Sequence, residues 1–338
     1  MRKLKVEEAV GECLAHDITE VVPQKKKEVA FARGHVIRKE DVKRFLDLGK
    51  SYVFVVSGQE PEVHEEEAAG RMAQAALREH MELSPAKEGR VNIRATVSGL
   101  LSVNRRRLAA MNRVKDVLFA TLTDAYPVRP GDVVASTRII PLSISEELLH
   151  EAEQIAREGI VKVEPFVPMR AGLVVTGTEV YTGRVVDGSS AVEEKLRGYG
   201  LDVIGKRVVP DEIEQIRDAI LELFRLGADL VITTSGLSVD PDDLTKEGIE
   251  ATGAKVVAYG APVFPGAMFL IATLNGRYIL GAPACVYYNA RTVLDVVVPR
   301  IMAGRRLTKR DLVKLAHGGL CLHCDVCHYP NCVFSRGC

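Results

Sequence analysis

From residue 171 onward, short apolar runs alternate with amphipathic segments. Five runs have the length and β-branched content of buried strands: 173–176, 201–209, 229–234, 254–258 and 277–280. Apolar residues recur at three- and four-residue spacing in the segments that predict helices: 189–199, 211–226, 245–252 and 290–302. Strands that alternate with helices of this length form right-handed βαβ units. Residues 170–305 are therefore expected to fold as a three-layer α/β/α sandwich with a mostly parallel sheet.

The pattern is mixed in residues 1–165, which predict an α+β N-terminal region. Strands are expected at 31–37, 51–56, 90–104 and 116–123, and helices at 39–48, 60–82 and 143–157. In the last helix, Ser143 and Glu146 have the spacing of a capping box. Asp211 is expected to cap the helix at 211–226 in the same way. Pro165 and Pro168 separate this region from the α/β domain.

Composition narrows the setting in which the protein works. The chain has 338 residues, with 45 Lys and Arg against 45 Asp and Glu, so no net charge attracts nucleic acid or a membrane surface. It contains no apolar run long enough for a transmembrane helix, and no apolar segment typical of a signal peptide follows Met1. A cytoplasmic protein is expected.

Three predicted strands end in residues that suit a binding site. These ends are Thr176-Gly-Thr-Glu179, Thr234-Ser-Gly236 and Gly281-Ala-Pro-Ala284. Ligands of α/β proteins bind beyond the carboxyl ends of parallel strands, and small residues there allow a ligand to approach the backbone. The second turn is followed by Asp240, Asp242 and Asp243. A phosphate beside these carboxylates implies a hard cation such as Mg²⁺ between them.

These motifs resemble a known family over residues 171–304. The matching segments, in order, are TGTE at 176–179, GRVVDGSS at 183–190, TSGLSVD at 234–240, DLT at 243–245, PVFPGAM at 262–268 and LGAPA at 280–284. Together they resemble the molybdenum-cofactor biosynthesis domain of molybdopterin adenylyltransferases, molybdopterin molybdenumtransferases and competence-damage-type proteins. Near the N-terminus, VEEAVG at 6–11 and the segment from Phe31 to Gly49 resemble the molybdenumtransferase type.

The resemblance implies a function in molybdenum cofactor biosynthesis and a set of site residues. Molybdopterin, or its AMP adduct, would be the ligand, and molybdate would be inserted with the help of Mg²⁺. Residues expected to act in catalysis are Asp243, Asp242 and Glu179, and Asp242 and Asp243 would hold the Mg²⁺. Residues expected to bind the cofactor are Thr176, Gly177, Asp187, Ser189, Thr234, Ser235, Gly236, Ser238, Pro265, Gly266, Gly281 and Pro283.

Three positions depart from the family pattern. Leu237 replaces a glycine, Ala267 replaces a basic residue, and the asparagine of the last motif is missing. Each change is expected to remove flexibility or a polar contact near the ligand. Besides a molybdenumtransferase, a non-catalytic molybdopterin sensor or carrier and a nucleotide pyrophosphatase of the competence-damage type remain open. The resemblance also implies a homo-oligomer, with molybdoenzymes or other cofactor-biosynthesis proteins as partners.

The last 33 residues, 306–338, form a cysteine-rich tail. Cys321, Cys324, Cys327, Cys332 and Cys338 follow one another as C-x2-C-x2-C-x4-C-x5-C. Thiolates at C-x2-C spacing converge on one centre in zinc and iron–sulfur sites. Cys321, Cys324, Cys327 and Cys332 are therefore candidate ligands of a [4Fe–4S] cluster or Zn²⁺, with a disulfide-linked tail as the alternative.

Overall fold

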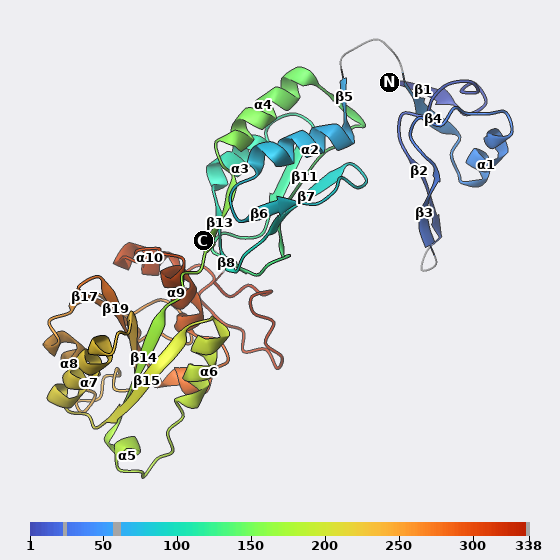
Figure 1. The fold of residues 1–338 in the computed structure, drawn as a ribbon. Helices are drawn as coiled ribbons and strands as arrows, with labels where there is room; N and C mark the ends of the chain where they lie inside the picture. Colours follow the sequence, from blue (N-terminus) through green and yellow to red (C-terminus); the bar gives the residue numbers. More distant parts are fainter. Residues whose placement is uncertain (23–25, 57–61, 336–338) are drawn as a thin grey trace.

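The computed structural model describes residues 1–22, 26–56 and 62–335 (Figure 1). Its first lobe contains the antiparallel pairs β1 (Arg2–Lys5) with β4 (Tyr52–Val55) and β2 (Ile18–Val22) with β3 (Lys26–Phe31), and α1 (Asp41–Asp47). Phe45, Val53 and Val55 are buried in a core of its own. The strand predicted at 31–37 is wrong, because β3 ends at Phe31 and the chain turns at Gly34, which has a φ of 82°.

A second core lies in residues 62–165. Two helices, α2 (Glu65–Ala76) and α4 (Glu146–Arg157), pack together, and α2 packs on β7 and β11. The other elements are β5 (Glu62–His64), β6 (Met81–Leu83), β7 (Arg90–Ala95), β8 (Gly99–Val103), α3 (Arg105–Met111), β9 (Val117–Thr121), β10 (Pro127–Val128), β11 (Val133–Ile139), β12 (Ser143–Ser145) and β13 (Val161–Pro165). The region predicted as one, 1–165, thus contains two separate cores.

Two helix predictions in this region need correction. The helix predicted over 60–82, whose first two residues lie outside the described part, covers only 65–76. His64 begins it by accepting the N–H of Glu66, and a turn at His80, with a φ of 64°, leads into β6. Ser143 is not a helix cap, because it pairs with His64 in the β5–β12 ladder, and Ser145 accepts the N–H of Leu148 instead.

The third unit is a six-stranded sheet in the order β15-β14-β16-β19-β18-β17. Its strands are β14 (Arg170–Thr176), β15 (Asp202–Val209), β16 (Leu230–Thr234), β17 (Lys255–Tyr259), β18 (Leu270–Leu274) and β19 (Arg277–Ala282). β15, β14, β16 and β19 are parallel, whereas β17 and β18 form antiparallel pairs at one side. The sequence pattern missed β18, which is joined to β19 by a two-residue turn, Asn275-Gly276.

Helices cover both faces of this sheet, which confirms the α/β/α sandwich. Alternate strand residues enter opposite cores: Leu173 and Val175 face α6 (Ser190–Gly198) and α9 (Val293–Met302), and Val174 faces α7 (Ile213–Arg225). The helix α8 (Thr245–Ala251) joins α7 on that second face. The remaining elements are α5 (Thr178–Tyr181), the 3-10 helix η1 (Ala284–Tyr287) and α10 (Lys309–Lys314). Among the described residues, no helix is long and apolar enough to cross a membrane.

Candidate functional site

The three predicted strand ends meet at one edge of the sheet. Parallel pairing places Val175 of β14 opposite Thr234 of β16, and Thr234 opposite Ala282 of β19. The buried Thr176 hydroxyl donates to the Thr234 carbonyl at 3.0 Å and lies 2.8 Å from the hydroxyl of Thr245. These bonds fix the ends of β14 and β16 to the first residue of α8.

The turn after β16 can be formed only by a small residue at position 236. Ser235 and Gly236 have φ angles of 74° and 61°. A Cβ atom on Gly236 would lie 2.9 Å from the Thr176 hydroxyl oxygen and would overlap that of Thr245. The Ser235 N–H donates to the Ala282 carbonyl at 3.1 Å. The N–H groups of Gly236 and Leu237 have no hydrogen-bond acceptor among the described residues, so this turn offers two adjacent donors.

The three carboxylates of this turn have different surroundings. Asp240 accepts the N–H of Asp242 at 3.1 Å, and Asp243 accepts the N–H of Ser238 at 2.6 Å. Asp242 is exposed, and its carboxylate bonds to no described residue. None of them caps α8, which begins after Leu244 without a side-chain cap.

The carboxylate pair matches only part of a metal coordination shell. Mg²⁺ in proteins commonly takes one or two carboxylates and keeps several waters, and Asp242 and Asp243 suit that arrangement. Within the described ranges, no three or more His, Cys, Asp or Glu side chains gather closely enough to hold a metal ion.

Glu179 and Asp187 lie on the segment that follows β14. Glu179 is exposed in α5, whose first N–H, from Thr178, is bonded to Asp211 at 2.8 Å. Asp211 therefore holds α5 rather than capping α7, which begins after Glu212 without a side-chain cap. Asp187 accepts the N–H of Ser189 at 2.8 Å and forms an ion pair with Lys206 at 2.7 Å.

The Lys206 pair sets the charge of this part of the site. Burial alone would raise the pKa of Asp187, but hydrogen bonds from Lys206 and Ser189 outweigh burial and hold that pKa below its usual range. Ser189 is fully buried, and its hydroxyl accepts from Lys206 at 3.2 Å. Asp187 is thus fixed as a carboxylate next to a cation at the start of α6.

Tyr287, which the sequence did not single out, connects these parts. Its hydroxyl donates to Thr234 Oγ1 at 2.6 Å and accepts from the Ser235 hydroxyl at 3.5 Å. A Cβ atom on Gly188 would touch its ring at 3.5 Å, so the 187–189 turn lies against it. Burial raises the pKa of Tyr287, which keeps the phenol protonated. The ring thus lies between the turn after β16 and the turn before α6, and no sequence motif could indicate this.

Pro265, Gly266 and Pro283 lie in two loops beside these turns, Gly281 lies in β19, and Gly177 precedes α5. Since Leu270 pairs with Gly281, the loop before β18 opens at the same edge as the other strand ends. It carries Pro265 and Gly266, which contact Val293 at the start of α9: the Val293 N–H donates to Pro265, and a Cβ on Gly266 would lie 2.6 Å from the Val293 Cβ. Pro283 begins the loop between β19 and η1.

Leu237, which stands where the family has a glycine, faces the core of the domain. Its side chain is only 2% exposed and lies in the core, where a Cβ on Gly281 would come within 2.8 Å of Leu237 Cδ1. The Leu237 side chain therefore packs into the core, and the loss of flexibility expected from replacing a glycine here stays a prediction. The backbone carbonyl of Leu237 accepts from Tyr259 at 2.8 Å, which anchors the turn further.

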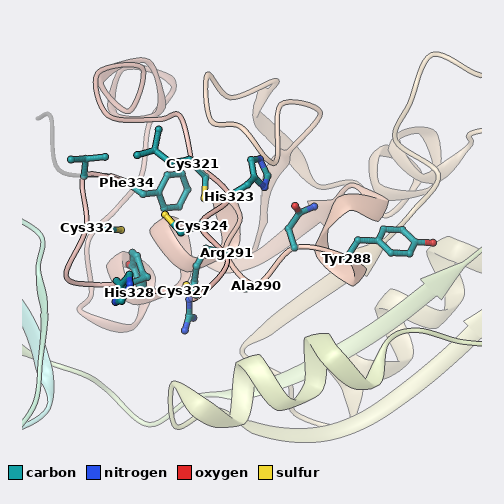
Figure 2. A pocket seen from close by; sticks show the side chains of 14 residues that line it. Tyr288, Ala290, Arg291, Cys321, His323, Cys324, Cys327, His328, Cys332 and Phe334 are labelled. Carbon is teal, nitrogen blue, oxygen red and sulfur yellow. The ribbon is translucent and has the colours of Figure 1, made fainter.

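The cysteines of the tail line a cavity that also includes the loop after η1. Cys321, Cys324, Cys327 and Cys332 line a cavity of about 290 Å³ together with His323, His328, Arg291 and the loop that follows η1 (Figure 2). All six cysteines of the described residues are free thiols, and Cys338 lies outside the described part. The tail reaches this position by pairing with the loop before β18: Phe264 donates to Gly319, and Cys321 donates to Phe264.

Comparison with known families assigns the α/β domain. Residues 172–303, which form the α/β domain, match the family described as "Probable molybdopterin binding domain". Residues 3–57, the first lobe, match a "Domain of unknown function (DUF8806)".

Curated proteins resemble only a short part of the chain. A competence-damage inducible protein of Clostridium novyi is 41% identical over 80 residues, which are 23% of this chain and 19% of that protein. A CinA-like protein of Frankia casuarinae is 44% identical over 85 residues, 25% of this chain and 19% of its own. The chain therefore spans about a fifth of the length of the curated relatives that it matches.

Solved structures resemble part of the chain. The molybdopterin biosynthesis enzyme MoaB from Thermus thermophilus is 20% identical, with a TM-score of 0.32 over 40% of this chain and 98% of that one. The tungsten cofactor synthesizing protein MoaB from Pyrococcus furiosus is 18% identical, with a TM-score of 0.34 over 41% and 98%.

Proposed function

We propose that the protein acts in molybdenum cofactor biosynthesis, by binding molybdopterin or its AMP adduct at the carboxyl edge of β14, β16 and β19 and inserting molybdate with the assistance of Mg²⁺. One observation carries this proposal. The residues that match the molybdopterin-binding family are those whose strand ends meet in a turn with two adjacent N–H groups that lack acceptors.

The terminal phosphate of the ligand would occupy that turn. The Gly236 and Leu237 N–H groups would donate to its oxygens, and the Ser235 and Tyr287 hydroxyls stand beside them. Such donors suit an anion because a hydrogen bond from the Ser235 N–H to the Ala282 carbonyl fixes the turn that carries them. Thr176 and Thr234 stabilise the turn rather than contact the ligand, since their hydroxyls form hydrogen bonds within the protein.

Mg²⁺ would be held by Asp242 and by the Asp243 oxygen that does not accept from Ser238, with waters and the phosphate completing its shell. Bound there, the ion would offset the negative charge that develops as a pyrophosphate bond is cleaved. Ser238 belongs to the same turn, and its N–H positions Asp243 rather than the ligand.

The other site residues would bind the rest of the ligand. Asp187 and Ser189 belong to the turn that lies against Tyr287, and the ion pair of Asp187 with Lys206 would keep a carboxylate in place for the pterin edge. Glu179 is exposed near Gly177 and would orient waters of the metal. Pro283 and Pro265 would line the other side of the ligand, where Gly281 and Gly266 allow Leu237 and Val293 to pack closely against the loops. The working protein would be a cytoplasmic homo-oligomer that delivers its product to molybdoenzymes.

Incubation of the purified full chain with adenylylated molybdopterin, molybdate and Mg²⁺ tests this proposal. Release of AMP that requires both molybdate and Mg²⁺ supports the molybdenumtransferase activity. Tight binding of molybdopterin without release of AMP would refute catalysis and favour a sensor or carrier. Hydrolysis of simple dinucleotides without molybdopterin binding would favour a pyrophosphatase of the competence-damage type.

A further inference from the structure

The cysteine tail is folded against the protein at its two ends but lacks internal support. Cys321 is joined to Phe264 by a backbone hydrogen bond at 2.9 Å, and Phe334 is buried in the core of the α/β domain. Between them, residues 322–330 form no helix or strand. Within the described chain, the N–H groups of residues 322–328 donate no backbone hydrogen bond.

Packing against the α/β core supports the tail only near its ends, where Cys321, Tyr329 and Cys332 are partly buried. Leu322 and Val326 are each 67% exposed, and Val333 is 61% exposed. A short segment without secondary structure or an apolar core usually depends on a disulfide or a metal for its fold. All thiols of the described residues are free, so a disulfide does not serve here.

Four thiols of the tail line the cavity. Cys321 and Cys332 are half-buried at its fixed ends, whereas Cys324 and Cys327 are exposed on its unsupported turns, and all four line the cavity of about 290 Å³ (Figure 2). No three of them converge on one point in the described residues. The two outer cysteines are held in place, and residues 322–328, which carry the two inner ones, donate no backbone hydrogen bond that would resist their approach.

Arg291 gives a second, independent indication. It lies in the wall of the cavity, and one of its guanidinium nitrogens donates to the fully buried Asp295 at 2.8 Å. Its Nε–H is buried and has no hydrogen-bond acceptor among the described residues. Sulfur ligands of metal centres are stabilised by N–H donors of this kind, which offset the charge of a thiolate set.

We propose that Cys321, Cys324, Cys327 and Cys332 bind one thiophilic metal centre, Zn²⁺ or an iron–sulfur cluster, with Arg291 as a positioning residue whose guanidinium donates to a ligand sulfur. Binding converts four thiols to thiolates and releases four protons to solvent. The centre would draw the two exposed turns onto the cavity and fix the tail against the loop before β18. That loop opens at the edge of the sheet where the pterin is proposed to bind. Metal binding by the tail would therefore stabilise one side of the proposed pterin site. The proposal does not rest on the proposed function.

Metal analysis of the full-length protein, purified without oxygen and with no pterin added, tests the proposal. We expect one zinc ion, or one cluster with visible absorbance, per chain; the metal content and the colour distinguish the two. Cys324→Ser and Cys327→Ser should each lower metal affinity at least tenfold, because they remove ligands that are exposed and not needed for packing. Cys13→Ser, which removes an exposed thiol of the first lobe, is the control and should leave the metal content unchanged.

Two further measurements complete the test. Removal of the metal by a chelator should make the tail sensitive to limited proteolysis, and Arg291→Met should weaken metal binding without changing the number of metal atoms bound. Full metal content in Cys324→Ser and Cys327→Ser would overturn the proposal. So would a wild-type protein that binds neither metal after reconstitution with zinc, or with iron and sulfide. Failure of this test leaves molybdopterin binding unaffected, so the two proposals can be refuted separately.

Discussion

Replacement of Gly236 by alanine probes the turn at the centre of the candidate site. The backbone at this position has a φ of 61°, which costs an L-residue other than glycine roughly 1–2 kcal/mol. The new Cβ would also lie 2.9 Å from Thr176 Oγ1 and closer still to Thr245 Oγ1, and such overpacking adds about 1–3 kcal/mol. The free energy of unfolding of the α/β domain should therefore fall by roughly 2–5 kcal/mol.

Gly276→Ala is the matched control for this variant. Gly276 lies in the same domain with a φ of 80°, but nothing lies within 4 Å of the Cβ that would be added there. Urea unfolding of both variants, monitored by a signal from the α/β domain, separates the free-energy cost of the backbone conformation from that of the steric overlap. Gly276→Ala should be destabilised by about 1–2 kcal/mol alone. If Gly236→Ala lost no more stability than Gly276→Ala, the close packing of the turn on Thr176 and Thr245 would be refuted.

Three more predictions concern carboxylates of the α/β domain. Asp295→Asn should lower the free energy of unfolding by about 3–5 kcal/mol in a denaturant titration, because the fully buried carboxylate accepts from a lysine, a tyrosine and an arginine. Asp243→Ala should destabilise the protein by about 1–3 kcal/mol through its lost backbone bond, whereas Asp242→Ala should stay within roughly 0.5 kcal/mol and affect only Mg²⁺-dependent turnover; equal stabilities would contradict the described turn. Lys206→Met should cost under about 1 kcal/mol near neutral pH, since the pair is partly exposed. The difference in stability between the two proteins should shrink as pH falls through the depressed pKa of Asp187, because the carboxyl becomes protonated in both proteins. Unfolding curves measured at a series of pH values test this. A difference in stability that does not change with pH would contradict it.

Periodicity predicted the α/β domain well because its signals are local. In α7, Ile216, Ile220 and Leu223 repeat on one face and are buried on the sheet, as their spacing indicates. The strand ends could be assigned to one edge because parallel strands require it. Local signals were misleading where two elements compete for one residue. Ser143 has the spacing of a capping residue, but its strand pairs with β5, and Asp211 precedes α7 but bonds across the sheet edge to Thr178.

The candidate site was predictable in position but not in its details. The motif residues Thr176, Thr234 and Gly236 do meet in one turn. The contribution of Tyr287 could not be read from the sequence, because its neighbours on the turns after β16 and before α6 are about 50 and 100 residues away. The orientation of the Leu237 side chain also could not be predicted, since a side chain that replaces a glycine can face either the ligand or the core. Here it faces the core.

Binding of molybdopterin to a charge variant of the turn tests the central claim most directly. Ser235→Asp places a negative charge where the phosphate would bind, and Asn275→Asp places the same charge at another residue of positive φ, in the turn that precedes β19 at the opposite edge of the sheet. Titration calorimetry with molybdopterin should show saturable binding by the wild type and by Asn275→Asp. Ser235→Asp should weaken the affinity at least about tenfold, or 1.4 kcal/mol. Equal affinity of all three proteins, or no binding by the wild type, would contradict a molybdopterin site at this edge.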